Sequence, residues 1–345
     1  MKLRVGIVGL GGQWESRHLP ALRALADRFE VRGICEQVGH RAAKAAAAIG
    51  SEPADGFRAL IARDDVDAIL YLADQWYGAT PVLAACDHGK AVYSAISLPF
   101  AADEAALVRR RVEESGIAFM AELPRRHMPA TVRLKELIAT KLGPPRLLFC
   151  HRRIPHAAAG PGAPRDGETE ARDLMELVDW CRYVAGTEPT SVVAVRHAER
   201  PGSEADDYRM MSLDFSPSGR PGDGAVAQIS CGYYMPRQWE EAVGFRPPPA
   251  LQAVCENGIA FVDLPAGLVW FDTAGRHQET LDSDRPVGET MLVQFHRAVT
   301  SLVRHMSGLD DTLRAMEIVR AAVTSAAEGR RVACGTARPL ASARG

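Results

Sequence analysis

The stretch LRVGIVGLGGQW (residues 3–14) decides what fold to expect from this chain. Leu3 to Val8 is a short apolar run with β-branched residues, which predicts a buried strand. The glycines that follow predict a tight turn. The leucines between Leu19 and Phe29 recur at helical spacing, so a helix is expected after the turn. This order of strand, glycine-rich turn and helix is the one that opens a dinucleotide-binding unit.

The glycine turn carries the first two-thirds of a GxGxxG fingerprint, in Gly9, Gly11 and Gly12. The first glycine permits the tight turn, and the second lets the backbone approach a pyrophosphate. The place of the third glycine is taken by Trp14. Its indole either fills the space that a pyrophosphate needs or covers an adenine, so Trp14 is a candidate cofactor contact.

Glu36 closes the next predicted strand, Glu30 to Cys35, at the position where an acid holds a ribose 2′-hydroxyl. A carboxylate there repels a 2′-phosphate, which favours NAD over NADP. Asp74 and Trp76 follow a later strand and are further cofactor candidates, because open α/β sheets bind ligands at their carboxyl edge. The alternative is that the glycines only make a turn and that Glu36 is surface charge.

Strands alternate with helices as far as residue 123, which predicts a doubly wound parallel sheet in an N-terminal Rossmann domain, 1–123. From residue 124 onward, strand-like runs joined by hairpin-length turns predict a large, mainly antiparallel open sheet. The fold class is therefore α/β with a second α/β domain, 124–345. Residues 157–173 are expected to be a mobile loop, and helices are expected over 174–184, 290–305 and from 310 or 311 to 329.

Composition excludes several classes of function. Lys and Arg number 41 and Asp and Glu number 43 among 345 residues, so the formal charge is −2. A near-neutral chain has no global electrostatic reason to bind nucleic acid or an anionic membrane. The sequence has no apolar run of about 18 residues, as a membrane span requires. The seven cysteines are odd in number and form no CxxC pair, which favours buried thiols in a reducing cytoplasm over disulfides.

Several short motifs in fixed order resemble the glucose–fructose oxidoreductase / inositol dehydrogenase / MocA (Gfo/Idh/MocA) family over nearly the whole chain. The resemblance implies a Rossmann domain, an α/β domain whose large open sheet is used in substrate binding and oligomerisation, and NAD(P)-linked redox chemistry on sugars or other polyols. By analogy it also implies a homo-oligomer, either a dimer or a tetramer. The motifs are Val5–Gly11, His18–Leu22, Asp67–Ile69, Gly89–Val92, Arg126–Ala130 and the tail from Ala315 to Val332.

The chain departs from the family pattern where the family carries its acid–base residues. The family's Glu-Lys-Pro corresponds to Ala95-Ile96-Ser97, and its second-domain histidine corresponds to Glu176. We therefore expect a divergent NAD(P)-dependent oxidoreductase, acting on a sugar-like or a less polar small molecule. Two alternatives remain open: a catalytically silent dinucleotide- or metabolite-binding protein, and a non-redox enzyme that uses the same cleft.

Three residues are the candidates for a proton route. Glu176 and Asp179 lie three apart on a predicted helix, so they share a face and could form an acid–base pair, or could be solvated charges. His127 follows the last Rossmann strand and could shuttle a proton at neutral pH, or could be a structural histidine.

Further candidates would contact the substrate. Arg126 precedes His127, and Tyr233 and Tyr234 lie on a predicted strand, where one should face the cleft and the other the core. His151 and His156 lack a third ligand at compatible spacing, so no metal is expected.

Overall fold

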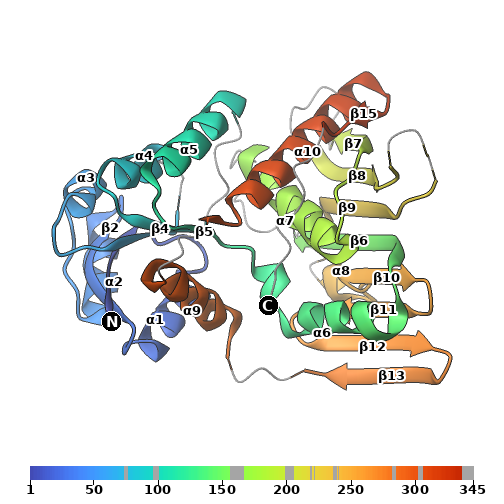
Figure 1. Cartoon of the computed structure of the whole chain (residues 1–345), viewed down its shortest axis with the longest axis horizontal. Helices are drawn as coiled ribbons and strands as arrows, with labels where there is room; N and C mark the ends of the chain where they lie inside the picture. Colours follow the sequence, from blue (N-terminus) through green and yellow to red (C-terminus); the bar gives the residue numbers. More distant parts are fainter. Residues whose placement is uncertain are drawn as a thin grey trace. The chain divides into compact units, whose positions relative to one another are not determined.

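The chain folds into two units (Figure 1). The first contains Met1–His127 and Asp284–Leu313, and the second contains Met128–Ser283 and Arg314–Gly345. The prediction from the sequence assigned all residues after 123 to the second domain. The difference arises because residues 284–313 supply a strand and a helix to the first unit. The computed structural model describes residues 1–73, 77–95, 101–155, 167–198, 206–217, 220, 222–235, 239, 241–281, 285–301 and 306–335.

The first unit is built on a parallel sheet that has six strands within the described residues, in the order β14-β5-β4-β3-β1-β2. β1 pairs with β2 on one side and with β3 on the other, so the strand order reverses direction beside β1. Ligands of open α/β sheets bind outside the carboxyl ends of the strands at such a point. The doubly wound Rossmann prediction is confirmed. The strands are β1 (Leu3–Val8), β2 (Phe29–Cys35), β3 (Ala68–Tyr71), β4 (Ala91–Ser94), β5 (Phe119–Ala121) and β14 (Met306–Ser307).

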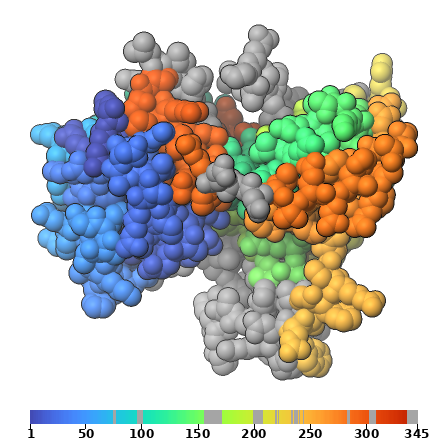
Figure 2. All heavy atoms as spheres, turned by 90° about the horizontal axis from the view of Figure 1, so that it is seen from below, coloured from blue at the N-terminus to red at the C-terminus, as the bar shows by residue number. Residues whose placement is uncertain are grey.

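Helices cover both faces of this sheet (Figure 1). α1, α2 and α9 share one apolar cluster with β1, and Figure 2 shows α9 against the N-terminal residues of the same unit. The predicted helix from Leu19 is shorter than expected, because a π-helical turn, η1, precedes it. The helical elements are η1 (Trp14–His18), α1 (Leu19–Ala24), α2 (Gly39–Ile49), α3 (Phe57–Ile61), α4 (Thr80–Asp87), α5 (Ala102–Ser115), η2 (Pro124–His127) and α9 (Val287–Thr300).

The second unit is built on a large sheet that has nine strands within the described residues, in the order β13-β12-β11-β10-β6-β9-β8-β7-β15. Its neighbouring strands are antiparallel except β6 and β9, which confirms the mainly antiparallel prediction. The strands are β6 (Pro145–Pro155), β7 (Ser191–Ala198), β8 (Asp206–Asp214), β9 (Val226–Met235), β10 (Leu251–Cys255), β11 (Ile259–Asp263), β12 (Gly267–Asp272), β13 (Gly275–Thr280) and β15 (Val332–Ala333).

Helices α6, α7 and α10 pack on this sheet, and Figure 2 shows α6 beside β12 and β13. α7 begins at Gly167, so residues 167–173 are helical and not part of a mobile loop as the sequence suggested. The rest of that predicted loop, 157–166, lies outside the described residues. The helical elements are α6 (Pro129–Leu137), η3 (Ile138–Leu142), α7 (Gly167–Ala185), α8 (Glu241–Gly244) and α10 (Leu309–Glu328), whose first turn belongs to the first unit.

Two composition-based expectations can be compared with the structure. All seven cysteines are buried and free, which confirms the prediction of buried thiols. Among the helices of the described segments, none combines the length and the apolar character that a membrane crossing needs.

Candidate functional site

The turn after β1 requires glycine at two positions. Gly9 and Gly11 have φ values of +70° and +62°, in the left-handed region that side chains disfavour. A Cβ on Gly11 would also lie 2.2 Å from the carbonyl oxygen of Leu72, and one on Gly9 would lie 2.7 Å from the Cβ of Ala73. A Cβ on Gly12 meets nothing within 4 Å. The backbone therefore packs tightly against the segment after β3, while the space beside Gly12 is open.

Glu36 lies directly against this turn. Its Oε2 accepts a hydrogen bond of 2.8 Å from the backbone N–H of Leu10, and its Oε1 accepts one of 3.1 Å from Gln37. Its side chain is 9% exposed, with Arg41 Nη1 at 3.9 Å. The acid at the end of β2 and the glycine turn after β1 thus form one constellation, as a ribose- and pyrophosphate-binding site requires.

The aromatic residues near the turn differ in burial, since Trp14 is buried while Tyr77 and Phe57 are half-buried. Trp14 is 4% exposed and belongs to the apolar cluster, so we assign it to packing and not to covering an adenine. Tyr77 Oη lies 3.8 Å from Cys35 Sγ, and the Tyr77 ring meets Phe57 edge-on. Burial raises the pKa of Tyr77 to about 12, so it is a neutral phenol. Asp74 and Trp76, the other cofactor candidates, lie outside the described residues.

A buried polar cluster occupies the carboxyl end of β5, and the sequence analysis missed it. Glu122 Oε1 accepts a hydrogen bond from Arg17, and its Oε2 lies 2.9 Å from His18 Nε2. The hydroxyl of Tyr93 donates to Oε2 at 3.1 Å. The side chains of His18 and Glu122 are 4% and 3% exposed. The cluster joins η1, β4 and the end of β5 by hydrogen bonds.

The charges of this cluster keep its acid ionised. Burial raises the pKa of Glu122, but the hydrogen bond to His18 and the charges of His18 and Arg17 outweigh burial, so the net pKa is lowered. Burial beside Glu122 holds the pKa of the Tyr93 hydroxyl well above its usual value. The available sequence signal was that Glu122 follows a parallel strand, at the edge where ligands bind. The partners are distant in sequence, which hid their pairing.

The structure changes the interpretation of His127. Burial lowers its pKa to about 4, with a further contribution from the charge of Arg126. The imidazole is therefore neutral at pH 7, and its Nδ1 lies 3.4 Å from Gln294 Nε2. A histidine of this pKa does not change charge near neutrality, and the role of His127 as a proton shuttle stays a prediction. Arg126, expected to contact substrate, donates a 2.8 Å hydrogen bond to Asp311.

Glu176 and Asp179 have different surroundings on α7. Glu176 Oε2 lies 3.6 Å from Arg152 Nη1, which is also 2.7 Å from Asp173 Oδ1, and its side chain is 35% exposed. Asp179 is buried, with Oδ1 3.4 Å from Arg182 Nη1. A buried carboxylate needs such a counter-charge. Glu176 and Asp179 thus meet different arginines, and Arg152 also binds Asp173 while Arg182 also binds Glu188. The acid–base pair of Glu176 and Asp179 stays a prediction.

Tyr234 lies on the open face of the large sheet, where its ring meets Tyr208 edge-on at 5.6 Å. Tyr233 is on the same strand, β9, but its side chain is outside the described residues. His151 Nδ1 lies 2.8 Å from Ser230 Oγ on the same open face. His156 is not described. The described residues contain no cluster of three or more His, Cys, Asp or Glu suited to a metal ion.

Two sequence comparisons each match part of this chain. Residues 3–109 match the model of the Gfo/Idh/MocA family, described as an oxidoreductase family with an NAD-binding Rossmann fold. D-xylose 1-dehydrogenase (NADP(+)) 2 of Haloferax volcanii is 33% identical over 139 residues. That match covers 40% of this chain and 42% of the relative, so the chain spans less than half the length of the curated protein that it matches.

Solved structures resemble the chain over nearly its full length. Levoglucosan dehydrogenase in complex with NADH has a TM-score of 0.82 at 19% identity, covering 98% of this chain and 100% of that one. Aldose-aldose oxidoreductase from Caulobacter crescentus, complexed with glycerol, has a TM-score of 0.81 at 17% identity, covering 96% and 100%. At such identities the likeness shows the fold. Residues 3–109 therefore match the NAD-binding Rossmann part of the Gfo/Idh/MocA oxidoreductase family, and the chain as a whole shares the fold of these solved structures.

Proposed function

We propose that this protein is an NAD-dependent oxidoreductase acting on a small molecule that is sugar-like or less polar than a sugar. The observation that carries the proposal is the contact between Glu36 and the backbone of the glycine turn at Leu10. It places a carboxylate beside the turn at the carboxyl edge of the parallel sheet, where a dinucleotide binds.

The residues of the turn fit the cofactor. Gly9 and Gly11 supply the backbone conformation, and the space beside Gly12 is open for a pyrophosphate. Glu36 would accept hydrogen bonds from ribose hydroxyls, and its charge would disfavour the 2′-phosphate of NADP. The NADP(+) dependence in the name of the Haloferax relative keeps NADP as the second choice. Bound NAD supplies hydride transfer, while the protein supplies orientation and a proton route.

The proton route has to differ from the one expected from the family. Ile96 and Glu176 stand where the resemblance places a lysine and a histidine. His127 stays neutral at pH 7, so in this proposal it acts as a hydrogen-bonding group beside the substrate and not as a titrating base. The substrate class follows the relatives, since D-xylose, levoglucosan and aldose are named for proteins similar to this chain.

A titration with NADH and NADPH, followed by nicotinamide fluorescence, tests the cofactor assignment. We expect NADH to bind more tightly than NADPH. A second assay measures turnover of NAD with a panel of aldoses, polyols and less polar alcohols. Binding of neither dinucleotide would overturn the proposal.

A catalytically silent dinucleotide-binding protein is the second candidate. The ion pair between Glu176 and Arg152 favours it, because that acid has a structural partner at the place of the family histidine. This candidate predicts NADH binding without turnover of any substrate in the panel. Turnover of one panel member at a rate typical of enzymes would exclude it.

We also propose that the protein is a homo-oligomer. We further propose that it works in the reducing cytoplasm, since its cysteines are free thiols. The open face of the large sheet exposes large apolar side chains. The registers of the paired strands place all of these side chains on the same face. We expect a dimer or tetramer by sedimentation, and a monomer for Leu147→Glu, with Val38→Glu in the first unit as the matched control. A monomeric unmodified protein would contradict the proposal. The exposed residues are Leu147, Val193, Val195, Tyr234 and Phe271.

A further inference from the structure

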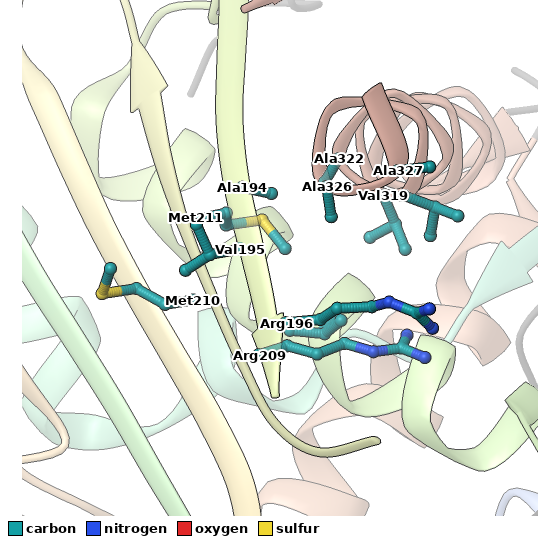
Figure 3. A pocket seen from close by; sticks show the side chains of 12 residues that line it. Ala194, Val195, Arg196, Arg209, Met210, Met211, Val319, Ala322, Ala326 and Ala327 are labelled. Atoms are coloured by element: carbon teal, nitrogen blue, oxygen red, sulfur yellow. The ribbon is translucent and has the colours of Figure 1, made fainter. Parts of the chain in front are cut away.

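A cavity of about 190 Å³ lies in the second unit, between α10 and the strands β7 and β8 (Figure 3). Ten of the twelve residues that line it are apolar, and the most deeply buried of these are at most 9% exposed. Protein interiors are normally close-packed, and the alanines of α10 are too small to fill this space. Cavities with apolar walls stay dry and bind apolar molecules, so this one suits a hydrocarbon and not a sugar. The deeply buried lining residues are Leu174, Ala194, Met211, Val319 and Ala322.

The cavity reaches the surface of the second unit. Val323, one of its lining residues on α10, is 46% exposed, so a small molecule has a way in from solvent. Arg196 and Arg209 also line the cavity, and Figure 3 shows their guanidinium groups at one end of it, away from Met211. The aliphatic stems of arginine side chains add apolar surface to such a wall. A neutral ligand contacts the apolar walls and needs neither guanidinium charge.

The two walls of the cavity differ in chemistry. Ala322 and Ala326 are four residues apart on α10, so their methyl groups lie on one face of the helix. Met211 comes from the opposite wall, on β8, and Figure 3 shows its sulfur on the side of the strand that faces these alanines. A methionine sulfur makes a favourable contact with an aromatic ring, which a saturated ring of the same size does not share. The sulfur therefore favours an aromatic ligand over a saturated one.

The volume of the cavity limits the ligand to one ring. An apolar cavity of about 150 Å³ in another protein holds benzene, so this cavity accommodates roughly one ring with one or two further carbons. We propose that the cavity binds a small neutral aromatic molecule, with its ring between Met211 and the alanines of α10. Every lining residue belongs to the second unit, so the site does not depend on the proposed binding of NAD.

The test is isothermal titration calorimetry of the full chain with benzene, toluene, cyclohexane and phenol. We expect benzene to bind with a stoichiometry of one per chain, and toluene to bind about fourfold more tightly because its methyl group is buried as well. Phenol should bind at least about tenfold more weakly than benzene, since its hydroxyl group leaves water. Cyclohexane, which makes no sulfur–aromatic contact, should bind about threefold more weakly than benzene. No binding of benzene, or binding of phenol or cyclohexane as tight as that of benzene, would overturn the proposal.

Variants locate the site. Ala322→Leu fills part of the cavity and should weaken benzene binding by at least about tenfold, while Thr324→Leu, at an exposed position of α10, is the matched control and should bind normally. Met211→Leu keeps the size of the side chain and removes the sulfur, so benzene and cyclohexane should then bind about equally. The thermal unfolding midpoint of each variant is measured as a check on folding. Unchanged benzene binding in a folded Ala322→Leu variant, or an unchanged preference for benzene in Met211→Leu, would refute the assignment.

Discussion

His18 Nε2 lies 2.9 Å from Glu122 Oε2, although 104 residues separate the two in sequence. Both side chains are buried at the carboxyl edge of the parallel sheet, and Arg17 and Tyr93 complete the cluster. A buried charge is stable only with partners of this kind. The cluster therefore fixes the helix that follows the glycine turn to the end of β5, and the turn is the part that would hold the dinucleotide.

Replacing Glu122 should destabilise the first unit. Glu122→Gln removes the negative charge while keeping the size of the side chain, and it leaves Arg17 without its ion-pair acceptor. We expect a loss of about 3 kcal/mol in the free energy of unfolding, measured with urea. Glu114→Gln, at an exposed position of α5, is the matched control and should change it by less than about 0.5 kcal/mol. Equal effects of the two substitutions would contradict the structural role of the cluster.

The carboxyl group of Glu122 also makes the free energy of unfolding depend on pH in the acid range. The pKa of Glu122 is lower in the folded protein than its ordinary value of 4.5. The unfolded chain therefore binds a proton more readily, and the stabilisation is fully present above pH 4.5. It should be lost as pH falls through the lower pKa of the folded state. The measurement is urea unfolding between pH 3 and 7, in which Glu122→Gln should show a flatter acid limb than the unmodified protein.

Gly11 and Gly12 are adjacent in sequence, but we expect alanine substitutions at the two positions to differ in their effect on stability. Gly11→Ala puts a Cβ into the Leu72 carbonyl at a positive φ, so we expect a cost of about 2–4 kcal/mol in the free energy of unfolding. Gly12→Ala meets no atom within 4 Å and should cost less than about 1 kcal/mol. Thermal unfolding of both variants checks the contrast. If Gly12→Ala were the more damaging of the two, the geometry of the turn would be wrong.

Local sequence patterns predicted the parts of the fold that depend on neighbouring residues. The run from Leu3 to Val8 and the glycines after it predicted the first strand and the turn, because backbone conformation there is set by residue type. The same patterns could not place residues 284–313, since joining β14 to β5 is a long-range pairing. They missed α7 before Leu174, because an Ala-, Gly- and Pro-rich stretch resembles a loop up to its last residues.

Like the fold, the candidate site was predictable only where it depends on the spacing of residues in the sequence. Glu36 follows its strand at a fixed spacing from the turn, and spacing alone was enough to bring the two together. The expected pair of Glu176 and Asp179 was based on helical spacing, which says nothing about the arginines that each acid meets. The cluster around Glu122 has members in three separate elements, so no local pattern reveals it.

Glu36 should determine the choice of cofactor. Glu36→Ala removes the acceptor for ribose hydroxyls, so NADH binding should weaken by about tenfold, as for a hydrogen bond to a charged group. NADPH should lose less, because the same carboxylate repels its 2′-phosphate in the unmodified protein. Fluorescence titration of both dinucleotides gives the ratio of dissociation constants. Glu30→Ala, on the same strand, is the control. An equal change in the ratio of dissociation constants in both variants would show that Glu36 does not determine the choice of cofactor.

The low pKa of His127 gives a prediction for both activity and stability. A folded-state value of about 4 against an ordinary 6.5 means that the unfolded chain takes up the proton first as pH falls. The stabilisation from neutral His127 is therefore complete above pH 6.5 and is lost between pH 6.5 and 4, by about 3 kcal/mol at most. His127→Gln should remove this pH dependence and keep a hydrogen-bonding side chain beside Gln294. Nuclear magnetic resonance of the imidazole protons checks the cause directly. A His127 titration midpoint near 6.5 in the folded protein would contradict the lowered pKa and would show that the histidine can act as a base near neutral pH.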